Sequence, residues 1–136
     1  HQNTRAGVEA ALLLAETLFL EGKYQEGIDI LRDFTTRGSA EVERAKIYSL
    51  IGDGMMQLGQ HKDAAGEYNR AAEAARFDGE RAQQLGKRAR ALVVAGDTAA
   101  GLSQWESLVE SEVPGIAAEA RVRVGELAAT PVAAAQ

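Results

Sequence analysis

The chain has 136 residues, enough for one domain with a hydrophobic core of its own. Its 20 acidic and 15 basic residues give a net charge of −5, which argues against a general nucleic-acid binder because phosphate neutralisation requires an excess of Lys and Arg. The sequence contains no cysteine, which excludes disulfides, thiolate metal sites and cysteine nucleophiles from these residues.

The first predicted unit covers residues 8–38 and contains two helices separated by Gly22. Apolar residues at helical spacing form one stripe before this glycine and another after it. The two stripes are Ala11, Leu14, Ala15 and Leu18, and Ile28, Leu31 and Phe34. A glycine that ends one such segment is typical of the left-handed residue that terminates a helix. The unit is therefore predicted to be a helix hairpin whose stripes face each other.

Two further predicted hairpins follow, over residues 39–77 and 78–113. Gly52 lies within the first stripe of the second unit, where it lets a neighbouring backbone approach closely. The stripes of the second unit are Tyr48, Ile51, Gly52 and Met55, and Ala64, Tyr68 and Ala71. Those of the third unit are Leu85, Ala89 and Leu92, and Leu102, Trp105 and Leu108. Trp105 is expected in the core, since it keeps helical spacing with its apolar neighbours.

A single helix is predicted over residues 114–129, with no second helix after it. It is expected to cap the open end of the array with a polar outer face provided by Glu119, Arg123 and Glu126. Residues 130–136 are expected to be a frayed tail. Three residues suit helix starts. Ser39 and Asp78 can cap free backbone amides, and Pro114 is tolerated in the first turn of a helix.

The three hairpins share a repeat of fixed length. The phrases at residues 20–24, 58–62 and 94–98 match, and Gly22, Gly59 and Gly96 are 37 residues apart each time. Such self-similarity is the signature of a repeat architecture, in which each unit buries its apolar face against its neighbours.

Over residues 8–129 this pattern resembles the tetratricopeptide repeat (TPR) family. The first unit matches the family motif at Ala15, Gly22, Tyr24, Gly27 and Leu31, and the second at Gly52, Gly59, Ala64, Tyr68 and Ala71. The sequence departs from the family in having His61 and Thr98 in the aromatic place, and in a period of 37 residues where the family has about 34. The additional residues are expected to lengthen the second helix or the link to the next unit. The predicted fold is all-α, a single TPR-like superhelix of about seven helices in antiparallel hairpins over residues 1–136.

The resemblance implies a right-handed superhelix whose concave surface, lined mainly by first helices, holds an extended peptide or a partner's helix. The inner positions carried over from the family are Glu9, Leu12, Glu16, Phe19, Lys46, Ser49, Asp53, Met56, Gln57, Gln83, Gly86, Arg90 and Val93. Apolar pockets would come from Leu12, Phe19, Met56 and Val93. Charges that orient a ligand would come from Glu16, Asp53 and Arg90. The alternative for Phe19 and Met56 is simple packing against the next hairpin.

Other chemistry finds little support in the residues. His61 has no second histidine or acidic cluster at ligand spacing, so no metal is expected. The segment 52–54 (Gly-Asp-Gly) follows no strand and lacks the lysine of a phosphate loop. The branch of the family that grips chaperone C-terminal carboxylates uses Lys, Asn and Arg at inner positions, where this sequence has Leu12, Glu16 and Leu50. A glutamate at such a position would repel the carboxylate.

The leading hypothesis is a protein-binding module or adaptor that is not an enzyme and uses no cofactor. The first alternative is a self-associating structural segment of a membrane-anchored bacterial TPR protein linked to secretion or envelope assembly, with a homo-oligomer formed through exposed end helices. The second is a small-ligand domain, which would need convergent polar groups between helices. Because the sequence begins with His1, we expect a processed piece, soluble in the cytoplasm or periplasm, that a preceding segment could tether.

Overall fold

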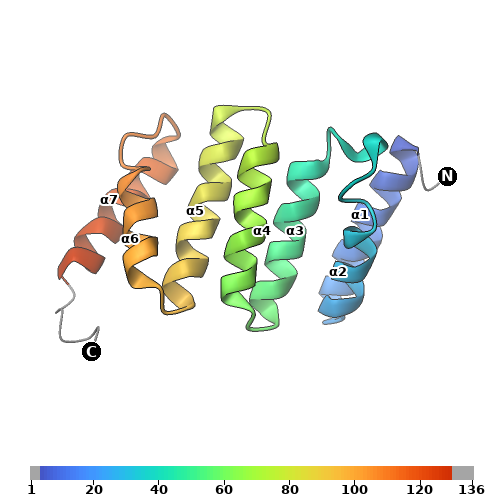
Figure 1. Ribbon diagram of the computed structural model, residues 1–136, viewed down its shortest axis with the longest axis horizontal. Helices are drawn as coiled ribbons and strands as arrows, with labels where there is room; N and C mark the ends of the chain where they lie inside the picture. Colours follow the sequence, from blue (N-terminus) through green and yellow to red (C-terminus); the bar gives the residue numbers. More distant parts are fainter. Residues whose placement is uncertain (1–3, 130–136) are drawn as a thin grey trace.

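The computed structural model describes residues 4–129, apart from the side chain of Ser39. Within that range the chain forms seven α-helices, one short 3₁₀-helix and no strand. The helices stand side by side in a row, with α1 and α7 at its two ends (Figure 1). Each helix packs mainly against the helices before and after it in the chain. The predicted all-helical fold is therefore confirmed, while residues 130–136, expected as a tail, lie outside the described range.

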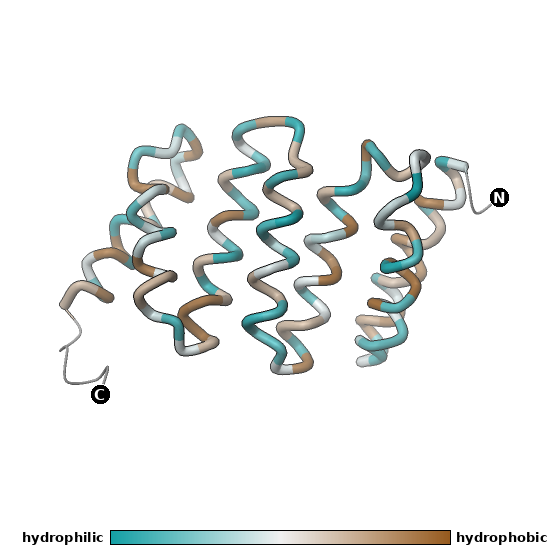
Figure 2. Tube along the Cα trace, in the orientation of Figure 1, coloured by the Kyte–Doolittle hydropathy of each residue, from teal (hydrophilic) through white to brown (hydrophobic). Residues whose placement is uncertain are grey.

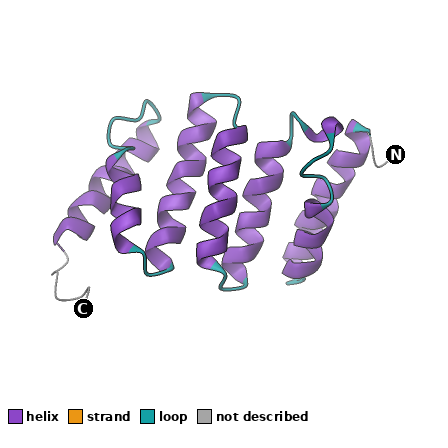
Figure 3. Ribbon diagram, viewed as in Figure 1, coloured by secondary structure: helices purple, strands orange, loops and turns teal. Residues whose placement is uncertain are grey.

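Tight turns and longer links alternate along the row. We call α1, α3, α5 and α7 the first helices and α2, α4 and α6 the second helices. The three turns within hairpins lie at one edge of the array and the links between hairpins at the opposite edge (Figure 3). The helices are α1 (Arg5–Leu20), α2 (Tyr24–Arg32), η1 (Gly38–Ala40), α3 (Arg44–Gln57), α4 (His61–Ala74), α5 (Asp78–Val94), α6 (Thr98–Glu106) and α7 (Pro114–Ala129).

The three hairpin turns have one geometry. Gly22, Gly59 and Gly96 have φ values of 78°, 77° and 91°, in the left-handed region that glycine enters without steric cost. In each turn the residue after the glycine donates its backbone N–H to a carbonyl five residues earlier. These hydrogen bonds are Lys23 to Leu18 at 2.8 Å, Gln60 to Met55 at 2.9 Å and Asp97 to Leu92 at 2.9 Å. This is the Schellman motif, which confirms the predicted helix-terminating role of the glycines.

The core is built by repeated positions. Leu31, Tyr68 and Trp105 occur at 37-residue intervals on the second helices and are 0%, 4% and 1% exposed. Trp105 is thus a core residue, as predicted. Gly52 admits the Tyr68 ring rather than a neighbouring backbone, since a Cβ added at Gly52 would lie 2.6 Å from Tyr68 Cε1. Along each helix, hydrophobic and hydrophilic positions alternate in short stretches (Figure 2), which is the pattern that this packing requires.

The facing of α1 differs from the prediction. Leu14, expected in the core, is 49% exposed, whereas Leu12, expected in a ligand pocket, is only 5% exposed. The buried stripe is Val8, Leu12, Ala15 and the half-buried Phe19. The reason is that α1 contacts α2, α3 and η1 together, so its buried side lies between these neighbours rather than opposite α2 alone.

The longer period is accommodated in two ways. In the first unit α2 has 9 residues, and the link that follows it includes η1. In the second unit α4 has 14 residues, and only residues 75–77 separate it from α5. Helices begin at Asp78 and Pro114 as predicted, although Asp78 does not cap α5, whose N-cap is Phe77. Ser39 lies within η1, and α3 begins only at Arg44.

Candidate interaction face

The inner positions implied by the resemblance lie on α1, α3 and α5. We call the surface that these positions form, continued onto α7, the first-helix face. Three of the positions are buried in the array: Leu12, Ser49 and Gly86. Six are half-buried: Glu16, Phe19, Asp53, Met56, Arg90 and Val93. The exposed positions are Glu9, Lys46, Gln57 and Gln83. The prediction that Leu12 lines a pocket is therefore wrong, because this side chain belongs to the core beneath α1.

Three ion pairs join successive first helices. Glu16, Asp53 and Arg90 occupy equivalent positions 37 residues apart, and each pairs with a residue of the next first helix. The pairs are Glu16 Oε1 to Lys46 Nζ at 3.5 Å, Asp53 Oδ1 to Lys87 Nζ at 3.2 Å, and Arg90 Nε to Glu119 Oε1 at 2.9 Å. We call them the first-helix ladder. The charges that the resemblance assigned to ligand orientation are thus paired within the array.

The middle pair of the ladder is tied into the core. Lys87 Nζ donates to Ser49 Oγ at 3.0 Å and approaches the two carboxylate oxygens of Asp53 at 3.2 and 3.3 Å. The Tyr68 hydroxyl donates to Asp53 Oδ1 at 2.7 Å. Burial raises the pKa of the Tyr68 phenol far above its usual range, and the hydrogen bond to Asp53 adds to this effect. Tyr68 therefore stays protonated and serves as a fixed donor.

The last pair of the ladder brings α7 onto α5. Arg90 donates through both Nε and Nη2 to the Glu119 carboxylate, a bidentate arrangement. These hydrogen bonds lower the pKa of Glu119 and raise the pKa of Arg90. Arg123 lies beside this pair. Its Nε is 3.7 Å from Glu119 Oε1, and its Nη1 is 3.0 Å from Glu126 Oε2. The predicted polar outer face of α7 is therefore wrong in part, because Glu119 faces α5 and its side chain is only 26% exposed.

The apolar positions of the face pack on small residues of the second helices. A Cβ added at Gly27 would lie 2.5 Å from Phe19 Cε1, and one added at Gly101 would lie 2.5 Å from Val93 Cγ2. Phe19 Cζ would also lie 2.8 Å from a Cβ at Gly54 of α3. Phe19 thus packs against the next hairpin, as the alternative interpretation expected. Met56 packs likewise on a cluster that includes residues of α5.

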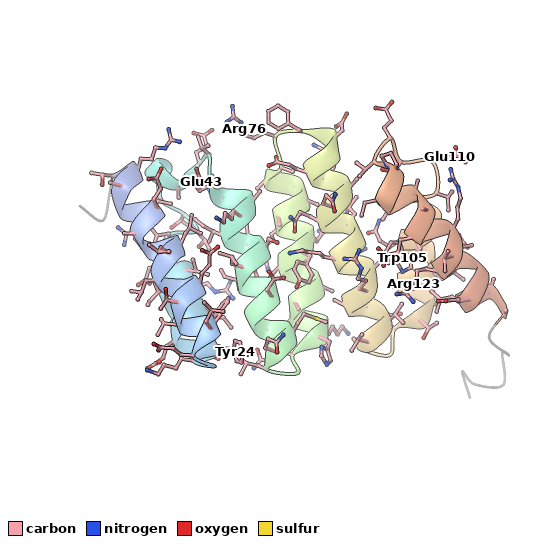
Figure 4. All side chains as sticks on the ribbon, turned by 180° about the vertical axis from the view of Figure 1, so that it is seen from behind. Tyr24, Glu43, Arg76, Trp105, Glu110 and Arg123 are labelled. Atoms are coloured by element: carbon pink, nitrogen blue, oxygen red, sulfur yellow. The ribbon has the colours of Figure 1, made fainter. Side chains whose placement is uncertain are left out.

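A cleft of about 310 Å³ opens on the first-helix face between α5 and α7. Its apolar lining comes from Val93 and Val94 of α5, Leu127 of α7 and Trp105 of the intervening α6. Arg90, Arg123 and Glu126 provide the polar part of the lining. Figure 4 shows Trp105 and Arg123 close together at this end of the array. The sequence singled out Arg90 and Val93 for the inner face. It placed Arg123 on the outer face of the last helix and missed Leu127, because this helix follows the three repeats from which the inner positions were carried over.

Neither a metal centre nor a membrane span emerges from residues 4–129. In this range no three His, Asp or Glu side chains gather as a metal ion would require. None of the helices described combines the length and the apolar character needed to cross a bilayer.

No protein-family model matches the chain, and no curated protein shows significant similarity to it.

Proposed function

We propose that the chain is a TPR-like superhelix that binds a segment of a partner protein along its first-helix face. Support comes from the three identical Schellman turns at 37-residue intervals and from the matching pairs of large and small residues within each hairpin. This construction aligns α1, α3, α5 and α7 on one side of the array. A row of parallel helices of this kind offers a partner segment a continuous surface.

The observation that carries the proposal is the cleft between α5 and α7. Its volume of about 310 Å³ is at the lower end of the range for ligand sites, a size that suits one or two bulky side chains of a peptide. Trp105 is only 1% exposed, whereas Val94 is 57% exposed and Val93 and Leu127 are half-buried, so these three residues provide the accessible apolar surface. Burial of apolar anchors beside arginine is typical of the residues that dominate protein interfaces.

The charges beside the cleft favour an apolar anchor over a purely ionic ligand. Arg90 and Arg123 are balanced by Glu119 and Glu126, with which they form ion pairs. The local net charge is therefore close to zero, and neither a strongly acidic nor a strongly basic peptide gains from long-range attraction. We propose an extended or helical segment that inserts one large apolar side chain and hydrogen-bonds through its backbone to the polar rim.

We propose no catalytic activity. Among the described residues the largest pKa change belongs to Tyr68 of α4, which donates to Asp53 of the first-helix face; such a change would normally mark a candidate acid or base. The phenol of Tyr68 is 4% exposed and donates its proton to Asp53, which leaves no reachable proton for a substrate.

A peptide selection tests the proposal. Peptides selected from a displayed random library on the immobilised chain should share a large apolar residue, and should bind wild type but not Leu127→Glu. This substitution places a charge in the cleft; because the half-buried Leu127 also packs against the core cluster of Trp105, circular dichroism of the variant should first match wild type. Glu106→Lys, at an exposed position of α6, is the matched control and should bind normally. Equal binding of the peptides to both variants would place the site elsewhere, and a selection that enriches no peptide would refute the proposal.

A further inference from the structure

The outward side of α1 carries an uncharged stripe. Leu13 and Leu20 are 66% and 90% exposed, and Ala6, Ala10 and Thr17 are exposed with them. These five residues recur every three or four positions, so they form one line along the helix, opposite the buried Val8 and Ala15. The Thr17 hydroxyl donates to the Leu13 carbonyl at 2.9 Å and so needs no partner from outside. We call this line the α1 stripe.

The α1 stripe differs from other exposed apolar residues of the array. Val42 and Phe77 are exposed singly in links between hairpins, which is ordinary for a protein surface. The stripe instead runs along the first helix of the row, on the side away from α2 and α3. At an open end of a helical array, a continuous apolar line of this kind marks an interaction surface.

The stripe is self-complementary in one orientation only. Leu13 lies midway between Ala6 and Leu20, with small residues toward the N-terminal end and a leucine at the C-terminal end. If a second α1 runs antiparallel about a two-fold axis at Leu13, each Leu20 meets Ala6 of the other copy, and Leu13 meets itself. A parallel pair would place Leu20 against Leu20 and Ala6 against Ala6, so the helices would splay at one end. Isologous pairing therefore favours the antiparallel arrangement.

The charges at the ends of α1 favour the same partner. A helix is stabilised by acidic residues in its first turn and basic residues in its last, and α1 has neither. Instead Arg5 stands at its first position and Glu21 directly after its last. In an antiparallel pair each Arg5 comes to the C-terminal end of the other α1, near Glu21 and the negative end of the helix dipole. The present partners of Arg5 and Glu21, Glu9 and Lys23, are exposed, so these pairs exchange at little cost.

From these features we infer that a second copy of the chain packs on the α1 stripe, antiparallel about a two-fold axis through Leu13. The inference is independent of the proposed peptide site. Helices α1 and α7 stand at opposite ends of the row (Figure 1), and the cleft is lined by residues of α5, α6 and α7. The dimer leaves both clefts free, and it presents them at the two distal ends of a double-length array.

Sedimentation velocity of the full chain over a wide concentration range tests the association. Wild type should shift from monomer to dimer, and Leu13→Arg and Leu13→Glu should each stay monomeric, because each places like charges across the axis. An equimolar mixture of the two variants should dimerise again. Val122→Arg changes an exposed residue of α7 and is the matched control, which should dimerise like wild type. A wild type that stays monomeric, a mixture that fails to dimerise, or a loss of dimer in Val122→Arg would overturn the inference.

Orientation is tested by oxidation, which the absence of native cysteine makes simple. The pair Ala6→Cys and Leu20→Cys should form an intermolecular disulfide when the two variants are mixed, while each alone should remain mainly reduced. Leu13→Cys alone should form a disulfide dimer. If Ala6→Cys alone and Leu20→Cys alone each form an intermolecular disulfide, and their mixture gives no mixed product, the pairing is parallel and the antiparallel geometry is overturned. Circular dichroism of each variant, matched to wild type, excludes unfolding as the cause.

Discussion

A pair of glycine substitutions isolates the tight contact between α3 and α4. Gly52 is buried in α3, and a Cβ added there would lie 2.6 Å from Tyr68 Cε1 and 2.9 Å from two further ring carbons. The ring has little freedom to move away, since Tyr68 is 4% exposed and its hydroxyl is held by Asp53. Gly66 in α4 is the opposite case, because the nearest atom to its added Cβ is the Arg70 Nη1 at 3.8 Å. Both positions are helical, so the change in helix propensity is the same.

The magnitudes follow from two opposing effects. Replacing Gly by Ala in a helix interior contributes about 1 kcal/mol of stability. Overpacking a core costs about 1–3 kcal/mol. Gly66→Ala should therefore stabilise the chain by about 1 kcal/mol. Gly52→Ala should be about 1–3 kcal/mol less stable than Gly66→Ala. Relative to wild type, Gly52→Ala should then range from neutral to destabilised by about 2 kcal/mol.

Urea denaturation followed by far-ultraviolet circular dichroism measures both variants. The informative quantity is the difference in midpoint between Gly66→Ala and Gly52→Ala at equal slope. A double-mutant cycle with Tyr68→Leu adds a control, because the cost of Gly52→Ala should fall when the ring is absent. If Gly52→Ala is as stabilising as Gly66→Ala, the close approach of Tyr68 to α3 does not constrain the fold, and the reasoning is refuted.

Three further predictions concern the first-helix face. Lys87→Met should destabilise the chain by about 1 kcal/mol, because Ser49 loses its donor and Asp53 its ion pair; urea midpoints check this. Glu119 has a lowered pKa, so its ion pair stabilises the fold above about pH 4.3 and ceases to do so as the pH falls through the lowered value. The Tm difference between wild type and Glu119→Gln should therefore be larger at pH 7 than at pH 3, and an equal difference would contradict this. Phe19→Ala should cost about 3 kcal/mol by thermal denaturation, and a change within error would show that its packing is dispensable.

Much of the fold could be predicted because its strongest determinants are local. The glycines at 37-residue intervals mark the hairpin turns, since few other residues enter the left-handed region at a helix end. The facing of α1 could not be predicted, because Leu12, Leu13 and Leu14 are adjacent and equally apolar. Only the neighbours that α1 meets in space decide which of the three leucines is buried.

The candidate site was predictable in part. The repeat identified Glu16, Asp53 and Arg90 as equivalent positions, but gave no means of finding the residues that pair with them. Those partners follow at unequal separations along the chain, because the links between hairpins differ in length. The cleft was missed for a related reason, since three of its seven lining residues come from α7, which belongs to no complete hairpin.

The reversal of charge at the last rung of the first-helix ladder fixes which hairpin can stand before α7. The first two rungs run from an acid to a base, and the last runs from Arg90 to Glu119. A chain that lacked the third hairpin would bring Asp53 toward Glu119, acid against acid, whereas one that lacked the second could still join Glu16 to Lys87. The units are therefore not interchangeable modules, and a misassembled or shuffled array is penalised by electrostatic repulsion at the junction that joins the last helix.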